Sequence, residues 1–441
     1  MHRLACRSDP KGGETTIRNE QISPVRGGRI LQWLVAGASS LAVVSGTAIS
    51  QAAQPPPAVA AEQYLRSLGL GASQLRAADG GQVVVRLIKT DDPRDVAVVG
   101  LMVVRASRDA LVARALDRNG FVVAQASRAG LFRSPPSPAD VAAVEVDPSE
   151  YKGLKSCRPG RCAFKLSASA MQSFTAGVDW SSPNAKAQAD QQLRGDLLRL
   201  VADYERRGTA AMPTYDDGPG VRSADAFAAV LAQTAPMLAA YAPELHRYLT
   251  TYPAGRPASA HDFVYWWEKR VPRMRPTLLI DHAVVYAPPN EPAFIVRKQV
   301  YATHYTEGGL DLLALLDGDV AAPAPVTRLI VVRRFRFDYL PVGLFNVRGR
   351  VRSRLVEVTR DDLTRERAAI ERTLGAAAHQ DRSRSDPAAI NRRTTSAKSD
   401  AMPTRVTGSS PSDSPAMESD TRTSLTPAPR IRSAAPATSR P

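Results

Sequence analysis

The chain has 441 residues, of which 44% are hydrophobic, and a formal net charge of +15. This length and apolar content suffice for a hydrophobic core. The charge does not by itself indicate a nucleic-acid partner, because residues 1–29 carry six Lys/Arg against three Asp/Glu and the residues after Gly375 carry ten against six. Since the chain also lacks a helix-turn-helix, zinc-finger, RNP or OB signature, we predict no nucleic-acid binding.

The N-terminal segment is typical of export. Arg26-Gly-Gly-Arg29 precedes an apolar run over residues 30–49, and small residues follow the run. This order predicts a secretory signal that is cleaved near Ala52 or Ala53. If the run of about 20 residues is not cut, it is long enough to anchor the chain in a bilayer. We therefore predict a signal or anchor within residues 1–53 and an exported protein in the periplasm or cell envelope.

The globular part is predicted over residues 61–375. Residues 82–89 and 95–105 are strand-like and are joined by the turn-forming Asp91-Asp92-Pro93. Ser107 is a good N-cap for a helix over residues 108–116. The first part of the domain is therefore expected to contain two strands followed by a helix.

Two cysteines lie in this part of the chain. Cys157 and Cys162 flank Arg-Pro-Gly-Arg, and the Pro-Gly centre suits a type II turn, because Pro fixes φ and Gly accepts a positive φ. In an oxidising compartment this predicts a disulfide across the turn. The spacing fits neither the two-residue redox motif nor haem attachment, and no nearby residues complete a zinc site. Free thiols or a bound metal are the alternatives.

The middle of the chain has a helical period. A helical insertion is predicted over residues 186–249, in which Pro236 kinks or splits an apolar helix that begins at Asp225. Before the insertion, residues 141–146 suggest a strand and residues 157–166 suggest a hairpin. The insertion thus separates the first strands from the rest of the domain.

Three antiparallel strands are predicted after the insertion. Residues 277–286 and 294–303 form a hairpin around a Pro-rich turn, and residues 327–339 form a third strand. Between them, Gly309-Leu-Asp-Leu-Leu-Ala-Leu-Leu316 is interpreted as a short helix.

The chain is then expected to close with a helix and a tail. Residues 359–374 have the apolar spacing of a helix. From residue 376 to 441 the chain is rich in Ser, Pro and Arg without a single aromatic residue, which predicts a disordered tail. Together these elements predict an α+β fold, with a curved antiparallel sheet that packs on a C-terminal helix.

A search for catalytic spacing finds no nucleophile elbow, no His-Glu-x-x-His, no phosphate loop and no dinucleotide fingerprint. The candidates that remain are His261, His282, His304, Glu307 and the pair Asp216-Asp217. With the hairpin centred near Asn290, His282 is expected opposite Lys298, so His282 and His304 are not cross-strand neighbours. We therefore assign no catalytic residue and no metal or cofactor.

Aromatic side chains gather around the predicted strands, and the ordinary explanation for each is a place in the core. The functional alternative is a pocket in which Tyr and Trp, with a few buried polar groups, bind an apolar ligand. The residues predicted to bind that ligand are Trp266, His282, Tyr301, His304, Tyr305, Phe335 and Phe337. Arg333, Arg334, Arg336 and the alternating arginines over 348–354 would form a basic face if extended. The ordinary explanation is a solvated face, and the functional alternative is a patch for anionic head groups.

The order of elements resembles the helix-grip arrangement of the START-like (SRPBCC) superfamily. The elements that carry the resemblance are the strand-strand-helix unit over 82–116, the strands within 276–339 and the final helix over 359–374. Lys298-Gln-Val-Tyr-Ala-Thr-His-Tyr305, followed by Gly309-Leu-Asp-Leu312, is also similar to exported bacterial proteins of unassigned function. The insertion and the arginines before the final helix depart from the superfamily's pattern. The resemblance implies a sheet that grips a long helix around an apolar cavity for lipids or polycyclic molecules.

The sequence therefore predicts an exported protein that binds a hydrophobic or amphipathic, lipid-like ligand, with a membrane surface as a further partner. One alternative is an envelope hydrolase or cyclase that uses His304 with Asp281 or Glu307. Another is a structural envelope protein whose basic tail contacts anionic polymer or lipid.

Overall fold

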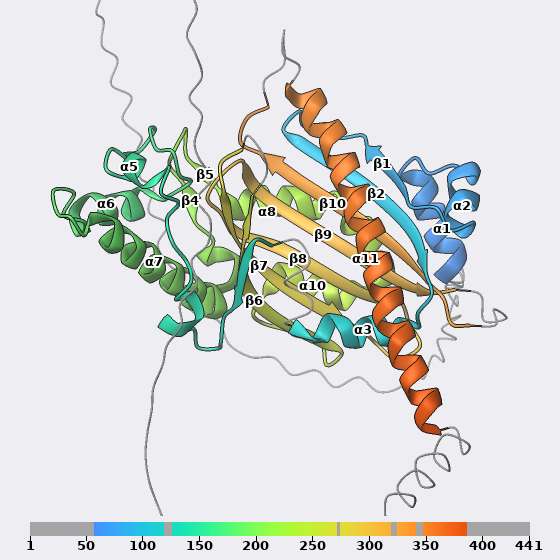
Figure 1. Cartoon of the computed structure of the whole chain (residues 1–441). Helices are drawn as coiled ribbons and strands as arrows, with labels where there is room; N and C mark the ends of the chain where they lie inside the picture. Colours follow the sequence, from blue (N-terminus) through green and yellow to red (C-terminus); the bar gives the residue numbers. More distant parts are fainter. Residues whose placement is uncertain (1–56, 119–125, 271–273, 319–323, 341–346, 386–441) are drawn as a thin grey trace, which may run out of the picture. The chain divides into compact units, whose positions relative to one another are not determined.

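The computed structural model describes residues 57–118, 126–270, 274–318, 324–340 and 347–385. Eight strands form one antiparallel sheet in the order β1-β2-β10-β9-β8-β7-β6-β3, and β4 and β5 form a separate two-stranded pair (Figure 1). The strands of the large sheet are β1 (Val84–Ile88), β2 (Asp95–Val104), β3 (Arg128–Leu131), β6 (Ala260–Lys269), β7 (Thr277–Tyr286), β8 (Ala293–Ala302), β9 (Thr306–Asp317) and β10 (Thr327–Phe337). The small pair is β4 (Thr214–Tyr215) and β5 (Val221–Arg222).

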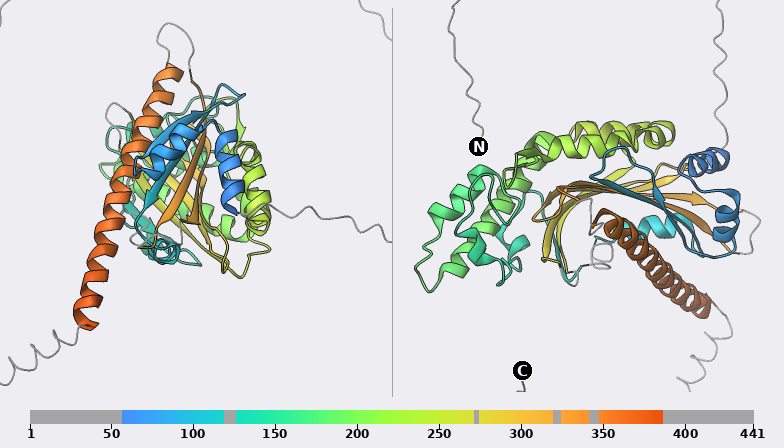
Figure 2. Two further views of the ribbon diagram at one scale, coloured as in Figure 1. Left: turned by 90° about the vertical axis from the view of Figure 1, so that its right-hand side faces the viewer. Right: turned by 90° about the horizontal axis from the view of Figure 1, so that it is seen from above.

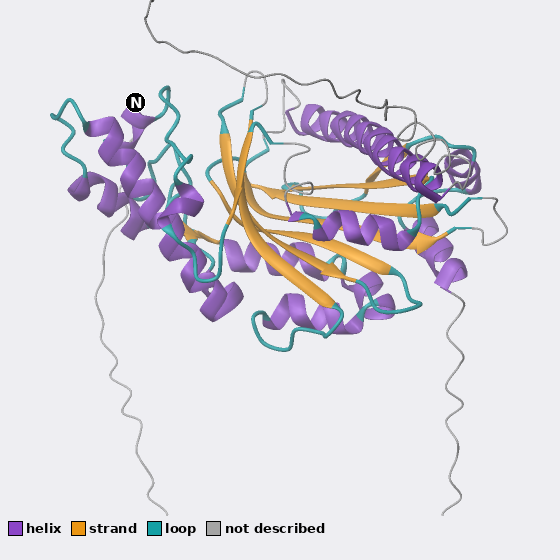
Figure 3. Cartoon of the chain, turned by 60° about the horizontal axis from the view of Figure 1, so that its bottom comes forward, coloured by secondary structure: helices purple, strands orange, loops and turns teal. Residues whose placement is uncertain are grey.

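Chain connectivity explains most of the strand order. The strands β6 to β10 are consecutive in the sequence and adjacent in the sheet, as short connections favour. The earlier strand β2 pairs with β10, and β1 pairs with β2 at the edge of the sheet. The central strands bend along their length, so the sheet has a concave and a convex face (Figure 3).

Helices lie on both faces of this curved sheet. Figure 2 shows α11 and α3 in the concave hollow, with the chain from α8 to α10 across the convex face. The concave helices are α3 (Arg108–Leu116) and α11 (Val347–Ser385), and the convex ones are α8 (Ser223–Ala232), α9 (Ala235–Tyr241) and α10 (Pro243–Thr251). Two N-terminal helices, α1 (Pro57–Ser67) and α2 (Ala72–Asp79), pack into the convex-side core.

Side-chain alternation along the strands divides the apolar residues between two cores. Leu312 of β9 belongs to the convex-side core, whereas its neighbour Leu313 packs against the concave-side core. The same split places Val332 on the convex side and Val331 on the concave side of β10. Because successive strand residues point to opposite faces, nearly continuous apolar runs supply both cores.

The helical insertion is confirmed, and it begins with a long helix. α7 (Ala185–Arg207) buries one side of its length, from Ala189 through Leu197 to Tyr204, and ends at Gly208 with φ +60°. The apolar helix predicted from Asp225 is split as expected into α8 and α9, and Pro236 lies in the first turn of α9, where its missing N–H costs no hydrogen bond. Short helices α5 (Tyr151–Leu154) and α6 (Ala168–Gly177) precede α7.

Three local predictions are wrong. Residues 309–316 are not a helix but the centre of β9, which pairs with β8 and β10. Its alternation was hidden because both faces of β9 are apolar, and a short apolar run does not distinguish a helix from a buried strand. Residues 141–146 form no strand, since a 3₁₀ helix over Pro138–Val141 leads into a loop. Residues 157–166 contain a single bridge between Arg158 and Arg161 rather than a hairpin.

The C-terminal helix is confirmed but is longer than predicted. The arginines over 348–354, considered above as an extended segment, lie in the first turns of α11, which continues to Ser385. The alternation of arginine with other residues misled the prediction because Arg is a good helix former at any position. The first ten residues of the predicted tail, 376–385, are therefore helical, and residues 386–441 lie outside the described residues.

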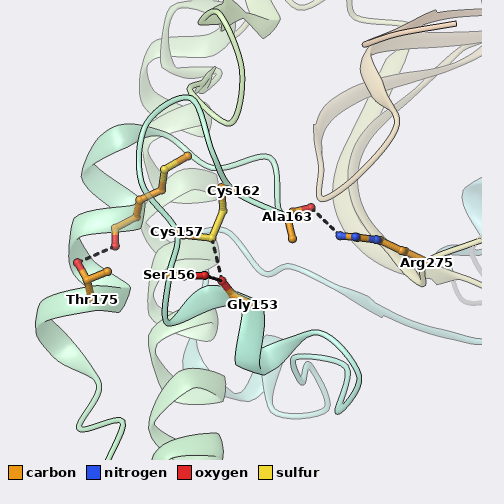
Figure 4. The surroundings of a disulfide bond; sticks show 8 residues. Gly153, Ser156, Cys157, Cys162, Ala163, Thr175 and Arg275 are labelled. Carbon is orange, nitrogen blue, oxygen red and sulfur yellow. Dashed lines mark hydrogen bonds between the residues drawn. A yellow bond between two sulfur atoms is a disulfide. The ribbon is translucent and has the colours of Figure 1, made fainter. Parts of the chain in front are cut away.

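The predicted disulfide is confirmed. Cys157 and Cys162 are joined, with their Cα atoms 4.4 Å apart (Figure 4). Gly160 in the intervening turn has φ +77°, a conformation that favours glycine. The Cys157 sulfur also lies 3.6 Å from the carbonyl oxygen of Gly153 in α5.

The N-terminal export segment, residues 1–53, lies outside the described residues. Among the helices that the structure describes, none is long and apolar enough to cross a membrane.

Candidate functional site

A cavity of about 100 Å³ lies between the concave face of the sheet and the two helices in its hollow. Leu111 and Ala115 of α3 and Leu363 and Ile370 of α11 contribute to its walls. The sheet contributes apolar side chains from three adjacent strands, namely Ile295, Leu313, Leu315, Leu329 and Val331. Most of the lining is therefore apolar and comes from elements far apart in the sequence.

The volume of the cavity limits the size of the ligand that it can enclose. A single water requires roughly 10–15 Å³, whereas sites for drug-sized ligands usually measure about 300–1,000 Å³. At about 100 Å³, the cavity has room for one small ring or the end of an alkyl chain. A larger ligand would have to extend out of it or displace a helix.

Polar groups complete the lining beside β6. The Nε1 of Trp267 donates a hydrogen bond to Oδ2 of Asp281 at 2.7 Å, and the hydroxyl of Tyr265 donates to the same oxygen at 3.3 Å. Burial raises the pKa of Asp281 to about 7, against the opposing influence of Arg297. The Asp281 carboxyl group therefore exchanges its proton near neutral pH, behind two aromatic side chains that line the cavity.

Charges of alternating sign cross the concave face beside these aromatics. Arg297 on β8 lies opposite Asp311 on β9, and Asp311 lies opposite Arg333 on β10. Arg297 is ion-paired with Asp311, and Nε of Arg333 lies 3.6 Å from Oδ2 of Asp311. Such cross-strand pairs of opposite charge stabilise a sheet register. They also put two guanidinium groups into the lining of the cavity.

The charges that cross the concave face continue from Arg333 onto α11. Nη1 of Arg333 donates to Oδ2 of Asp362 at 2.9 Å and to the hydroxyl of Thr359 at 3.3 Å. One turn further, Leu363 packs over Gly100 of β2, where a Cβ atom would lie 2.6 Å from Cδ1 of the leucine. A glycine at this position thus lets α11 approach the sheet.

The cavity reaches solvent between its two helices. Arg114 of α3 and Glu366 of α11 both line it, and Nε of the arginine lies 3.7 Å from Oε1 of the glutamate. Both side chains are partly exposed, at 26% and 35%. An ion pair with this exposure is weak, so it presents a low barrier to the entry of a ligand.

None of the seven residues that the sequence assigned to ligand binding lines this cavity. Trp266 and His282 point into the convex-side core instead. The indole Nε1 of Trp266 donates to the carbonyl oxygen of Asp140 at 2.8 Å. A one-residue step along β6, from Trp266 to Trp267, separates the convex face from the cavity.

His282 belongs to a buried polar network on the convex side. Its Nε2 lies 3.0 Å from Oδ2 of Asp262, and its Nδ1 lies 3.0 Å from the hydroxyl of Tyr204. Burial lowers the pKa of His282, so the neutral ring donates to Asp262 and accepts from Tyr204. Tyr248 donates to the same Asp262 oxygen at 3.0 Å, which completes the network.

Lys298 lies opposite His282 on β8, as the hairpin geometry predicted. Its ammonium group donates to the hydroxyl of Thr209 at 2.7 Å and lies over the rings of Phe227 and Tyr204, at 4.2 and 5.1 Å from their centroids. Burial lowers the pKa of Lys298 to about 7. The convex core therefore holds a lysine that is close to losing its charge at neutral pH.

Three other predicted residues gather where β8 turns into β9. His304 does not pair with Asp281 or Glu307, because its Nε2 lies 3.2 Å from Oε2 of Glu150. Tyr305, with φ +68°, accepts a hydrogen bond on its hydroxyl from the backbone N–H of Arg275. The ring of Tyr301 lies 6.1 Å from that of Tyr215.

Charged side chains from distant segments meet at the same end of the sheet. Nζ of the buried Lys165 lies 3.4 Å from Oδ2 of Asp338 and 3.8 Å from Oδ2 of Asp217. Glu307 lies 3.4 Å from Arg94 and 3.5 Å from Arg336. The sequence thus singled out Asp217 and His304 without their buried partners, Lys165 and Glu150, which belong to remote loops.

Phe335 and Phe337 lie at the C-terminal end of β10 and are half-buried. Gly309 on β9 leaves room for Phe335, since a Cβ atom there would lie 2.9 Å from the ring. The backbone N–H of Phe337 donates to the carbonyl oxygen of Arg94 at 3.0 Å. Both side chains thus lie beyond the apolar residues of β10 that line the cavity.

The polar lining of the cavity was not predicted, although the sequence contains a pattern that indicates it. Tyr265, Asp281, Arg297, Asp311 and Arg333 occupy inward positions of five consecutive strands whose other inward positions are mostly apolar. A polar residue at one buried position of every neighbouring strand marks a shared polar stripe. The strand order was needed to recognise it.

Comparisons with protein-family models, curated proteins and solved structures find no match. Within the described part of the chain, no group of three or more His, Cys, Asp or Glu side chains is arranged to hold a metal ion.

Proposed function

We propose that the protein binds a small amphipathic molecule in the cavity between the concave face of the sheet and α11. The observation that carries the proposal is the cavity itself, with apolar walls and polar lining groups from Tyr265, Trp267, Arg297 and Arg333. Pockets with an apolar lining and a few fixed polar groups are the usual form of small-molecule sites. The START-like resemblance suggests the same function and stays a proposal with it.

The proposed ligand has an apolar part and a polar end. Its apolar part packs among the leucines and isoleucines of α3, α11 and the central strands. Its polar end lies beside the guanidinium groups and the indole N–H of the stripe. Asp281, with a pKa near 7, makes the charge of this surface depend on pH.

The apolar surface that a ligand can bury in the cavity limits its affinity for the protein. Burying about 200 Å² of apolar ligand surface contributes roughly 5 kcal/mol, which alone corresponds to a Kd of about 0.2 mM. Tighter binding requires a hydrogen bond or ion pair with the stripe, or a larger contact created by movement of α11. We therefore expect rings and chains that carry a polar group to bind more tightly than pure hydrocarbons.

A cavity-filling substitution tests the proposal. Ala115→Leu on α3 adds three carbon atoms to the lining, whereas Ala113→Leu adds the same group on the exposed side of the same helix. Ligand-observed NMR titration with benzoate, a single small ring with an anionic group, should show saturable binding in the wild type and in Ala113→Leu, and at least tenfold weaker binding in Ala115→Leu. Circular dichroism checks that both variants fold. Equal binding by all three proteins would contradict the proposal.

A second candidate function, hydrolysis at His304, has one supporting observation: the pair Glu150–His304 lies at the same end of the sheet as Lys165 and Asp217. Perturbed acidic groups beside a histidine are typical of catalytic sites, and burial raises the pKa of Asp217. This candidate predicts that His304→Ala abolishes hydrolysis of an ester or glycoside panel without unfolding the protein. Because the cavity lies elsewhere, Ala115→Leu should leave such activity unchanged.

A further inference from the structure

The polar part of the cavity lining contains more hydrogen-bond donors than acceptors. Among the described residues that line it, Tyr265, Trp267 and three arginines carry N–H or O–H donors. Asp362 and Glu366 supply the carboxylates of the same lining. A ligand group that accepts hydrogen bonds therefore meets more partners here than a group that donates them.

Four of these donor side chains already have carboxyl partners within the protein. The pairs are Tyr265–Asp281, Trp267–Asp281, Arg297–Asp311 and Arg333–Asp362. Breaking such a buried pair is costly, because it leaves one charge without its partner. These groups can contact the polar end of a ligand, but since each is paired they do not favour an anion over a neutral group.

Arg114 differs from these four because it lies at the opening of the cavity between α3 and α11. Its side chain is 26% exposed, and its one ion pair among the described residues joins Nε to Oε1 of Glu366 over 3.7 Å. That distance is longer than a hydrogen bond. The N–H groups of Arg114 are therefore available to a ligand that enters between the two helices.

The neighbours of Arg114 on α3 place an apolar surface next to its charge. Leu111 and Ala115 also line the cavity, and both are buried. Residues three and four apart lie on one face of a helix, so α3 presents these apolar groups and the guanidinium group to the same space. This order fits a ligand whose apolar ring enters the cavity while its polar group stays at the opening.

We infer that the ligand carries an anionic group of the carboxylate type and that Arg114 determines this specificity. The inference rests on the proposed function. A guanidinium group binds a carboxylate through two parallel N–H donors, which a neutral hydroxyl group does not match. Glu366 competes for the same arginine and repels the anion, so its carboxylate limits the affinity. A cation is disfavoured because three arginines line the cavity against two carboxylates.

Three small ligands with the same ring test this specificity on the full chain. At neutral pH benzoate is an anion, benzyl alcohol is neutral and benzylamine is a cation. Ligand-observed NMR titration gives the Kd of each, and the readout is the Kd of benzyl alcohol divided by the Kd of benzoate. In the wild type this ratio should be about ten, as a hydrogen bond to a charged group implies, and benzylamine should bind most weakly.

Three substitutions identify the charge that sets the ratio. Arg114→Gln should lower it at least fivefold. Glu366→Gln should raise it about threefold, because it removes the competing carboxylate from a partly exposed pair. Arg360→Gln removes the same charge from an exposed position of α11 that does not line the cavity, and should change the ratio less than twofold. Circular dichroism checks that each variant folds.

The outcomes separate this inference from the proposed function. Equal decreases of the ratio in Arg114→Gln and Arg360→Gln would overturn the inference, because net charge alone would then explain the preference. A wild-type ratio of one or less, with saturable binding of benzyl alcohol, would also overturn it and leave the proposed function standing. If none of the three ligands binds, the proposed function fails and the inference fails with it.

Discussion

The two faces of the sheet are built from the same strands and differ in what covers them. Helices α8, α9 and α10 cover the convex face, and the cavity beside Phe294 and Met237 on that side measures about 10 Å³. On the concave face, α3 and α11 leave a cavity of about 100 Å³. The convex side is thus packed as an ordinary core, whereas the concave side keeps a space that a ligand can fill.

The buried charges of the two faces differ in the same way. On the convex side, the ammonium group of Lys298 has a hydroxyl and two rings as neighbours, and burial lowers its pKa to about 7. On the concave side, Arg297 and Arg333 are paired with aspartates. A charge without a counter-ion tends to be neutralised in a tight core, while paired charges persist beside a cavity. The comparison teaches that the concave face is the side on which paired charges lie beside an open space.

The largest expected difference comes from adjacent leucines of β9. Leu312→Ala opens a hole in the convex core and should lower the free energy of unfolding by about 3–5 kcal/mol. Leu313→Ala enlarges an existing cavity on the other face and should cost about 1–2 kcal/mol. Urea denaturation of both variants measures the two values. Similar costs would mean that the two faces are packed equally.

Lys298→Met should stabilise the protein at neutral and lower pH. The folded state lowers the pKa of Lys298 from 10.5 to about 7, so protonation opposes folding below pH 10.5, and the penalty is complete below pH 7. This penalty is up to about 5 kcal/mol. The wild type should therefore gain stability relative to Lys298→Met as the pH rises from 7 to 10. A constant difference between the two proteins over this range would show that Lys298 keeps its ordinary pKa.

Asp281→Asn should change the pH dependence with the opposite sign. The folded state raises the pKa of Asp281 from 3.8 to about 7, so ionisation opposes folding, and the wild type should lose stability as the pH rises from 4 to 7. Because Asn stays neutral, the variant should lack this loss, which is up to about 4 kcal/mol. Thermal unfolding measured at about pH 4, 5.5 and 7 shows whether the stabilities of the two proteins depend differently on pH. Parallel pH profiles would contradict the assignment.

Asp362→Asn should weaken the attachment of α11 to the sheet. The substitution removes the charge that faces Arg333, but Asp311 at 3.6 Å and Thr359 at 3.3 Å still contact that guanidinium group. We therefore expect a cost of about 2–3 kcal/mol, below that of a wholly unpaired buried charge. Hydrogen exchange should increase in α11 and stay unchanged in α8. Exchange that increases equally in both helices would argue against a separately attached α11.

Local patterns predicted much of the fold, because caps, breakers and periodicity act within a few residues. Ser107 caps α3 through the N–H of Ala110, and the apolar helix is split beside Pro236, which lies in the first turn of α9. Cys157 and Cys162 were recognised from the turn between them. The error at residues 309–316 has a physical reason as well, since a strand buried on both faces has no polar period to reveal it.

The candidate site was less predictable, because it depends on which face each strand residue occupies. Trp266 was chosen over Trp267 although the adjacent residue faces the cavity, and local sequence carries no sign of this difference. His304 was singled out from the sequence, but Glu150, its partner, is 154 residues away. Contacts of this separation follow from the tertiary fold alone.

Native mass spectrometry of the protein purified from its own host, with organic extraction, tests the central claim most directly. The account predicts a reproducible extra mass in the wild type and in Ala113→Leu, recovered as a lipid-like or ring-containing compound, and its loss in Ala115→Leu. A clean apo mass in all three proteins, without a thermal shift across a panel of amphipathic compounds, would contradict it.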